Sequence, residues 1–490
     1  MKLKTRTIEI LSEAEMDQIW ETALQIWPKV PLRAAGNEEF TQAVVDFGCK
    51  IDGNRIWLPE SVREKVLERV AQERERRGPP RPAEVENDKI GRITNGQAFY
   101  CCGIQSGEVR PATTQDLAQW SRVCDTIPDL QRAHPTYIPQ DVPIASCDVH
   151  TFATVILNSR RPCRVSVFDA DMLPFFIQLQ AICDGGTAAV RLDPIFNVTC
   201  YASSPSTISH EAIEVAMRAR RSLGKPFTIS AMPVVGSATP TTLAGSLAQS
   251  TAECLTMNAI TLAVDDRLNG WMESPTVMDM RSGMAMISGP DFALVRLAYA
   301  QMAAYVFGGT YSGTGSLSTT SPIPGPQAAI EKCLDAMWGF CNGVRSFSSL
   351  GILGCSDAAG VTQLMIDLEI VSHFERLARG ISVDEDRLAA DLITEVAPRG
   401  AYYLGEPHTA SHFRQELWTP DLMVRRSTMA WITDPSDMLD NARKKALQVV
   451  EGAENQCPLD DSQRSQVAEI LKEADAVAQE KTSRTRVSKP

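Results

Sequence analysis

The sequence predicts an α/β protein built on a TIM-type (β/α)8 barrel, with an added N-terminal helical region and a C-terminal helical extension. Its 490 residues exceed one ordinary domain, and a barrel of roughly 250 residues with helical additions fits that length. Short apolar runs alternate with longer helical patterns through residues 96–380. Eight such alternations point to a closed parallel barrel over this range.

Residues 1–95 precede the predicted barrel and have a helical pattern. Met16, Ile19, Trp20 and Leu24 follow helical spacing, ahead of the short extended piece IDGNRIWLPE. The stretch ERRGPPRPAEVENDK is charged and contains prolines, which is typical of a linker or arm. We therefore expect an N-terminal helical region that ends in an arm.

Eight segments are the predicted barrel strands. They are QAFYCC, LQRAHPTYI, PCRVSVF, IFNVTCYA, PFTISAM, AITLAV, GTYSG and GVRSFSS. The helices between them have readable ends, with Thr239 as an N-cap before Pro240 and Gly224 just past a C-terminus. Residues 381–455 then form the helical extension. Residues 456–490 read as a polar tail, partly disordered because its end is poor in apolar residues.

Composition excludes several classes of protein. The chain carries 48 basic and 60 acidic residues, a net charge of -12, without a basic patch that could bind nucleic acid. No apolar run approaches the roughly 18 to 20 residues that a membrane helix requires. The 13 cysteines form no CxxC pair, and the start MKLKTRTIEI lacks a leader pattern. We expect reduced thiols in a cytoplasmic protein.

In such a barrel the active site lies at the C-terminal ends of the strands. The candidates there are Tyr100, Cys101, Cys102, Tyr137, Asp169, Tyr201, Met232, Asp265, Asp266, Tyr311, Ser312, Phe347 and Ser348. Aromatics are prominent among them although they make up only 6% of the chain. Ring faces attract cations and need no hydrogen bond, so such a pocket suits a quaternary ammonium or sulfonium group. For any single tyrosine, packing at the barrel mouth is the more common role.

His408, His412 and Glu416 are spaced four apart and would share one face of a helix. Two imidazoles and a carboxylate can bind zinc, yet the HExxH pattern places its glutamate between the histidines, where Thr409, Ala410 and Ser411 stand here. The spacing alone favours capping or packing over a metal site. No phosphate-binding loop and no GxSxG nucleophile motif is present either.

Several segments resemble the trimethylamine methyltransferase family, including its glycine betaine members that lack pyrrolysine. They are FGCKIDGNRIWLPESV, GSATPTTLAGSLAQSTAECL, SPTVMDMRSG, GISVDEDRLAADLI and YYLGEPHTASHFRQE, in the family's order, over nearly the whole chain. The resemblance implies a TIM barrel that passes a methyl group to the cobalt of a separate corrinoid protein. It also implies that the segment around His408 is a family signature and not a zinc site.

The departures from that pattern affect the substrate pocket. Where trimethylamine enzymes carry pyrrolysine, this chain reads TTSPIPGPQAAIE, with Ser321 or Pro322 at that position. The family's histidine, tryptophan and glutamate positions in its LHSAGWLEGG stretch become Ser348, Ile352 and Gly354. The resemblance therefore implies an altered donor, which need be neither trimethylamine nor glycine betaine.

Without pyrrolysine, we expect a donor that already carries positive charge, because it leaves as a neutral amine or sulfide without prior protonation. Tyr100, Tyr137, Tyr201, Tyr311 and Phe347 are the predicted cage. Asp265 or Asp266 either attracts the cation or serves as a turn or cap residue.

Arg345 could pair with a donor carboxylate, and Trp271 could close over the pocket; a structural ion pair and simple packing are the alternatives. No tightly bound cofactor is expected, and the partners are an onium substrate, a corrinoid protein and further copies of the chain. A noncatalytic quaternary-amine binder and a metal-dependent barrel enzyme remain the alternative functions.

Overall fold

The computed structural model describes residues 3–160, 165–186, 195–271, 274–313 and 315–487. Its α-helices are α1 (Glu13–Ile26), α2 (Glu38–Phe47), α3 (Glu60–Arg77), α4 (Thr114–Thr126), α5 (Cys147–Asn158), α6 (Leu173–Asp184), α8 (His210–Leu223), α9 (Leu243–Asp265), α10 (Pro290–Phe307), α11 (Pro326–Cys341), α12 (Val361–Arg379), α13 (Glu385–Leu388), α14 (Ala390–Val396), α15 (Pro407–Glu416), α16 (Thr428–Thr433), α17 (Met438–Gly452) and α18 (Asp461–Val487).

The strands are short. They are β1 (Thr5–Arg6), β2 (Leu32–Ala34), β3 (Lys50–Asp52), β4 (Arg55–Trp57), β5 (Arg81–Pro82), β6 (Glu84–Val85), β7 (Gly91–Thr94), β8 (Tyr100–Cys102), β9 (Val109–Pro111), β10 (Leu130–Ala133), β11 (Cys200–Ser203), β12 (Thr207–Ile208), β13 (Ile229–Ala231), β14 (Val234–Val235), β15 (Thr276–Met278), β16 (Ala285–Met286), β17 (Thr310–Tyr311), β18 (Ser346–Phe347), β19 (Ile352–Leu353) and β20 (Ala358–Ala359).

The N-terminal region is helical because its helices carry good caps and apolar faces. Ser12 and Glu15 form a capping box at the start of α1, which satisfies backbone N–H groups that would otherwise lack acceptors. The buried face of α1, with Met16, Ile19 and Ala23, packs against α9. Strands β2, β3 and β4 join β11, β12 and β13 in one sheet, so this region is continuous with the centre of the protein.

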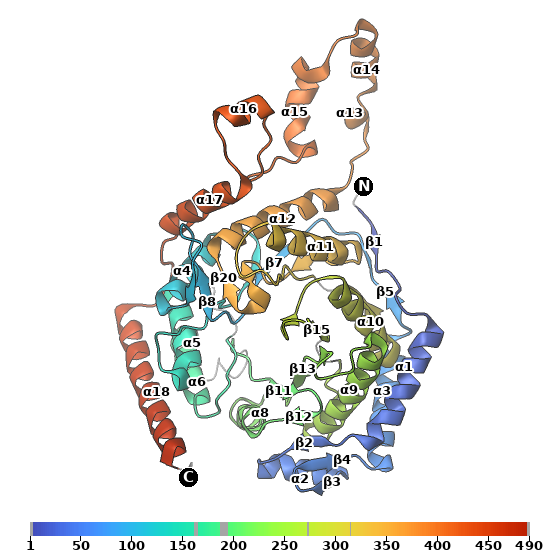
Figure 1. The fold of residues 1–490 in the computed structure, drawn as a ribbon, viewed down its shortest axis with the longest axis vertical. Coiled ribbons are helices and arrows are strands. Elements are labelled where there is room, and N and C mark those ends of the chain that lie inside the picture. The colour runs from blue at the N-terminus through green and yellow to red at the C-terminus, as the bar shows by residue number, and fades with distance from the viewer. Residues whose placement is uncertain (1–2, 161–164, 187–194, 272–273, 314, 488–490) are drawn as a thin grey trace.

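The central strands pair in parallel, in the order of the chain. β7 pairs with β10, β11 with β13, β14 with β15, and β18 returns to β7. Parallel bridges also join Ser166 to Asn197 and Ser316 to Ser348. Figure 1 shows β7, β11, β13 and β15 around a centre, with α4, α5, α6, α8, α9, α10, α11 and α12 outside them. In the described residues the strands form six separate sheets and not one closed cylinder, so what the structure shows is a mixed α/β fold.

One of the predicted strands is wrong, and a second forms a strand in a different sheet from the one predicted. The run AITLAV lies inside α9, and the strand at this stage of the ring is β15. The run is apolar because α9 is buried along nearly its whole length, and a fully buried helix has the same composition as a buried strand. QAFYCC contains β8, which joins a sheet with β9, β19 and β20. The ring strand in this part of the chain is β7, which precedes β8 in the sequence. Residues 162–164 of PCRVSVF lie outside the described residues.

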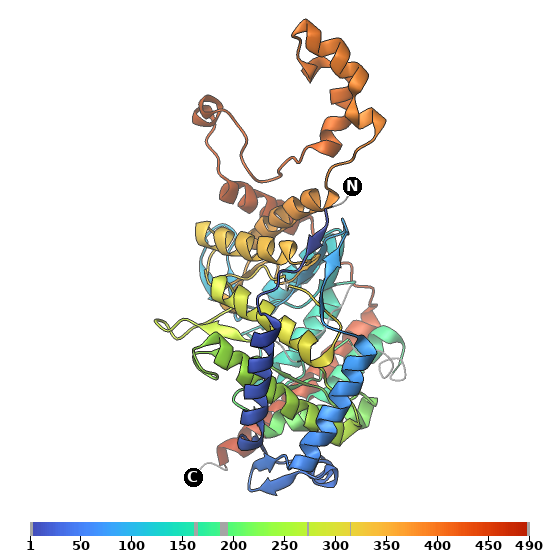
Figure 2. The same ribbon diagram turned by 90° about the vertical axis from the view of Figure 1, so that its right-hand side faces the viewer.

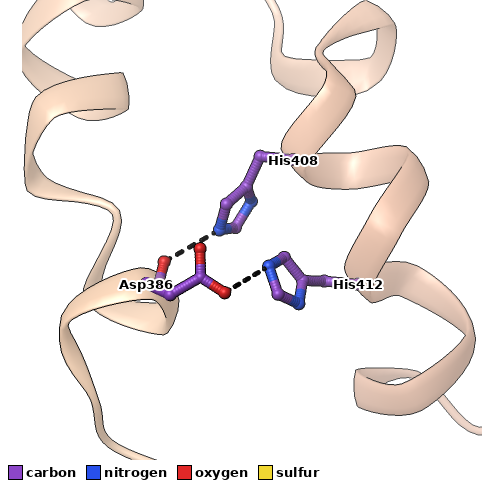
Figure 3. Close-up of side chains that lie close together, drawn as sticks. All are labelled: Asp386, His408 and His412. Atoms are coloured by element: carbon purple, nitrogen blue, oxygen red, sulfur yellow. Dashed lines mark hydrogen bonds and ion pairs between the residues drawn. The ribbon is translucent and has the colours of Figure 1, made fainter.

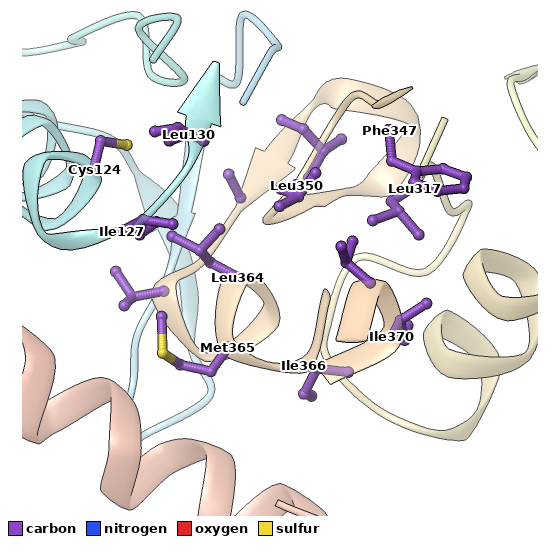
Figure 4. Close-up of a cluster of buried hydrophobic side chains, with 14 of the residues drawn as sticks. Cys124, Ile127, Leu130, Leu317, Phe347, Leu350, Leu364, Met365, Ile366 and Ile370 are labelled. Carbon is purple, nitrogen blue, oxygen red and sulfur yellow. The ribbon is translucent and has the colours of Figure 1, made fainter. Parts of the chain in front are cut away.

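One large core cluster contains buried side chains from the strands β8 and β18 and from the helices α4 and α12. Figure 4 shows part of it, with Leu317, Phe347 and Leu350 packed near Leu364 and Ile370 of α12. Phe347 is fully buried and its ring lies 5.2 Å from that of Phe374. Phe347 therefore packs in the core, although the alternation of residues along its strand is equally consistent with a side chain that points to the centre of the ring.

The C-terminal part has two different characters. Residues 381–437 leave the body after α12 and return at α17, and both views show this segment standing off the rest of the molecule (Figures 1 and 2). The segment 456–490, expected as a partly disordered tail, contains α18, which packs against α5 and α6. Val467, Ala474 and Ala478 are buried there, because apolar residues recur at helical spacing. In the described residues, no helix combines the length and apolarity needed to cross a membrane.

Candidate functional site

A cavity of about 710 Å³ lies where several of the central strands end. Its wall includes residues that follow β7 and β13, namely Asn95 and Met232, and the loops around Ser312 and Ser348. A large part of the wall is one face of α10, which lies between β15 and β17 in the chain. These two strands have no bridge between them in the described part of the chain. The cavity is large enough for a small-molecule ligand.

Aromatic rings form one side of this cavity. The ring of Trp271 lies 4.7 Å from that of Tyr299 and 5.7 Å from that of Phe307, and all three line the cavity. Tyr311 lines it as well. Among the described residues, the Trp271 Nε1 and Tyr299 Oη atoms are buried without a hydrogen-bond partner. Burial raises the pKa of Tyr299 well above its usual value, so its hydroxyl stays protonated.

A charged group from α10 completes the site. Arg296 lines the cavity, and its guanidinium lies 4.7 Å from the centre of the Phe292 ring. Asp335 lies beside it across a much smaller void that also contacts Ser316. Burial raises the pKa of Asp335 from 3.8 to about 7, although Arg296 pulls it down. Arg296 thus provides a guanidinium at one edge of an aromatic pocket, the geometry that suits a carboxylate.

Hydroxyl groups form another part of the wall. Ser316 and Ser318 lie 2.5 Å apart through their Oγ atoms, and the Ser316 hydroxyl donates to Ser349 Oγ at 3.2 Å. Ser348 lines the same wall and donates to the Gly315 carbonyl at 3.1 Å. These groups are neutral and mutually hydrogen-bonded, so this wall is polar without adding charge.

Of the predicted cage residues, Tyr311 lines the cavity and the other four do not. Tyr137 is buried against Trp120, and its hydroxyl donates to the Ala359 carbonyl at 3.1 Å. Phe347 lies in the core shown in Figure 4. Tyr100 and Tyr201 are exposed, and Tyr201 Oη accepts a hydrogen bond from Asn197.

The predicted charged residues are held in structural contacts. Asp265, at the end of α9, accepts from Arg220 at 2.6 Å and from the Phe227 backbone N–H. Asp266 pairs with Arg69 at 2.5 Å. Neither carboxylate lines the cavity.

Arg345 also lies away from the cavity. Its guanidinium donates to the carbonyls of Asn87, Phe340 and Val344 and to Thr5 Oγ1. It also stacks on the Phe340 ring at 4.2 Å. Arg296 and Arg77 line the cavity, and Arg345 does not.

The two histidines of α15 lie together, but Glu416 is not with them. His412 Nε2 lies 3.1 Å from Asp386 Oδ2, and His408 Nε2 lies 3.0 Å from the Asp386 carbonyl (Figure 3). Glu416 instead pairs with Arg387 at 2.9 Å. Ligand atoms of Asp386, His408 and His412 lie within 4.8 Å of one another, a donor set that zinc accepts. The cluster lies on the projecting segment, so it contributes nothing to the cavity.

The prediction missed the residues of α10. Phe292, Arg296, Tyr299, Ala303 and Phe307 recur at intervals of three and four, so they share one face of the helix. That spacing is visible in the sequence, with alanines between the larger side chains. The sequence does not show which face of α10 meets a cavity, because the helix is apolar on every side.

Comparisons with known proteins identify the family. The profile of the trimethylamine methyltransferase family (MTTB) matches residues 1–477. The trimethylamine methyltransferase MttB of Desulfitobacterium hafniense is 24% identical over 455 residues, 92% of this chain and 87% of that protein. A glycine betaine methyltransferase from another strain of that species is 24% identical over 449 residues, 90% of this chain and 92% of that protein.

A solved structure, the monomethylamine methyltransferase of Methanosarcina barkeri, covers 90% of this chain and 93% of its own, with 11% identity and a TM-score of 0.38, which does not settle the fold. The resemblance seen in the sequence is confirmed by the profile, which spans nearly the whole chain. The protein with this aromatic, arginine-edged cavity therefore belongs to the trimethylamine methyltransferase family, a family of methyltransferases.

Proposed function

We propose that this protein transfers a methyl group from a carboxylated onium compound, such as a betaine, to the Co(I) centre of a separate corrinoid protein. The observation that carries the proposal is the cavity that joins an aromatic wall to Arg296. We also propose that the ring of parallel strands is a (β/α)8 barrel. The chain-ordered pairings and the helices outside them support that topology.

The aromatic wall would hold the cationic head of the donor. A quaternary ammonium or sulfonium group offers no hydrogen bond, and the faces of Trp271, Tyr299 and Tyr311 attract it without requiring one. Such contacts are worth about 0.5–2 kcal/mol each, and more where water is excluded. Among the described residues that line the cavity, none is a carboxylate that could form a salt bridge with the methyl-bearing atom.

Arg296 would hold the other end of the donor. A guanidinium binds a carboxylate through two parallel hydrogen bonds, which fixes orientation as well as position. A donor without a carboxylate, such as trimethylamine or tetramethylammonium, would not make these two hydrogen bonds. The glycine betaine methyltransferase among the relatives acts on a compound of the carboxylated type, which agrees with this assignment.

The chemical step is a displacement at carbon. The Co(I) electron pair forms a bond to the methyl carbon while the carbon–nitrogen or carbon–sulfur bond breaks. The bonding pair stays with the leaving group, which departs as a neutral tertiary amine or a sulfide, so no proton needs to be supplied. The residues of the cavity would act by orienting the donor and by excluding water.

A test follows the change from Co(I) to methyl-Co(III) by absorbance, with the full chain, free Co(I) cobalamin and matched donors. Glycine betaine and dimethylsulfoniopropionate carry a carboxylate, whereas tetramethylammonium and trimethylsulfonium do not. We expect turnover with carboxylated donors only, and an increase in KM of about 10- to 100-fold in R296M, the loss of one charged bidentate contact. R55M changes an exposed arginine outside the cavity and is the matched control.

The outcome separates the remaining alternatives. Equal turnover of donors with and without a carboxylate would refute the role of Arg296. Measurable donor binding without any methyl transfer, with several corrinoid proteins, would favour a noncatalytic binder. Turnover that requires added zinc and is lost in H412A would favour a metal-dependent enzyme.

A further inference from the structure

The segment that stands off the body, residues 381–437, is called the projection here. It leaves the body at the end of α12 and returns at the start of α17. In both views its helices α13 to α16 lie beyond the rest of the molecule (Figures 1 and 2).

The projection is firmly attached at its base. The Glu369 carboxylate of α12 accepts hydrogen bonds from the backbone N–H groups of Asp421, Leu422 and Met423, at 3.1, 3.1 and 3.2 Å. The Trp418 ring lies 3.9 Å from that of His373, and its Nε1 donates to Ser372. A loose loop would not be fixed by a buried carboxylate, so the protein holds this segment in a defined place.

In the projection, charged side chains lie between the helices and large apolar side chains lie on the surface, which is the reverse of an ordinary folded domain. Charged groups hold its helices together, with Arg387 bonded to both Asp384 and Glu416. Large apolar side chains face outward instead: Leu388, Tyr402, Leu404, Leu417, Met429 and Ile432 are between 59% and 89% exposed. Large apolar side chains in such number on one segment are unusual for a monomer, and they favour an interaction site.

The body of the same chain carries an apolar face that could receive it. On α11, Ile330, Leu334 and Met337 follow helical spacing and are 60%, 64% and 44% exposed. The opposite side of α11 is in the core, through Ala336 and Phe340. The helix therefore has an outward stripe that nothing in the described residues covers.

We propose that two copies of this chain exchange projections, each laid on α11 of the other. Every copy carries both surfaces, so a two-fold arrangement covers all four at once. If each exposed side chain of the projection buries on the order of 100 Å², two projections and their receiving faces bury on the order of 2,000 Å². That is the size of a stable interface, about 1,200–2,000 Å². A different protein that bound only one of the two surfaces would leave the other surface, the α11 stripe or the projection, exposed to solvent.

The test measures the mass of the full chain by analytical ultracentrifugation over a range of concentrations. The wild type should be a dimer or a higher even-numbered assembly. The variant L404E/L417E places charges on the projection, and L334E places one on α11; each should raise the dissociation constant by at least 100-fold. I144E is the matched control and should leave the mass unchanged, because Ile144 is 88% exposed and belongs to a turn that packs against α18 and α5.

Mixing the two defective variants gives the sharper result. In an L404E/L417E copy α11 is intact, and in an L334E copy the projection is intact, so the mixed pair keeps one of its two contacts. We expect heterodimers in the mixture at concentrations where each variant alone is monomeric. A wild type that is monomeric at all concentrations would overturn the proposal. This includes the case in which the projection binds only the corrinoid protein. Loss of dimer with I144E, or no heterodimer on mixing, would also overturn it.

Discussion

The buried pair between α11 and α12 gives the most direct test of the packing. Lys332 Nζ lies 2.7 Å from Asp367 Oδ2, and both side chains are 0% exposed. Asp367 also accepts from the Gly351 backbone N–H at 2.6 Å and from Gln363 Nε2 at 2.8 Å. Burial lowers the pKa of Lys332 and raises that of Asp367, and each charge partly offsets the effect on the other. Removing one charge leaves the other buried without compensation.

K332M keeps most of the side-chain volume and removes only the charge. Loss of one partner of a buried pair costs about 3–5 kcal/mol in the free energy of unfolding. Asp367 keeps two hydrogen bonds in K332M, so we expect a loss near the lower end of this range, about 3 kcal/mol in the free energy of unfolding. The double variant K332M/D367N removes the stranded charge and still offers an oxygen to Gly351, so it should regain most of that loss.

The assay is urea unfolding followed by circular dichroism at pH 5 and pH 8. In K332M the carboxyl can escape its penalty by binding a proton, so the loss of stability should be smaller at pH 5 than at pH 8. The reasoning is refuted if K332M loses less than about 1 kcal/mol, or if the double variant is no more stable than K332M.

Three further predictions concern other parts of the fold. Because the pKa of Asp335 is raised to about 7, the carboxyl stays protonated to higher pH in the folded chain than in the unfolded chain, so stability falls as pH rises from about 4 to 7. D335N should flatten this slope, by at most about 1.4 kcal/mol per pH unit in urea unfolding. An unchanged slope would contradict this role of Asp335. E369Q weakens the three backbone contacts at the base of the projection, so hydrogen exchange should quicken in residues 418–424 while α4 stays unaffected. Gly351 has a φ of +82° and a Cβ there would lie 2.3 Å from Trp120, so G351A should lose more than about 1 kcal/mol, and a variant as stable as wild type would disprove the close contact.

The sequence by itself determined much of the local structure and the family. Gly224 ends α8 in the left-handed conformation, as predicted, because a residue without Cβ adopts it at little cost. The ordered segments from FGCKIDGNRIWLPESV to YYLGEPHTASHFRQE were sufficient for the family, which the profile over residues 1–477 confirms. Both kinds of signal depend on residues close together in the chain, so they need no knowledge of which elements meet.

Only the tertiary structure decided which side chains reach the cavity. Phe347 and Tyr311 are both aromatics of predicted strands, yet one lies in the core and the other lines the cavity. Arg345 and Arg296 are likewise indistinguishable by composition, and the cavity has the one on α10. The physical reason is that alternation along a strand, or spacing along an apolar helix, groups residues by face but does not say what each face meets. That depends on contacts between segments far apart in sequence, which the fold brings together.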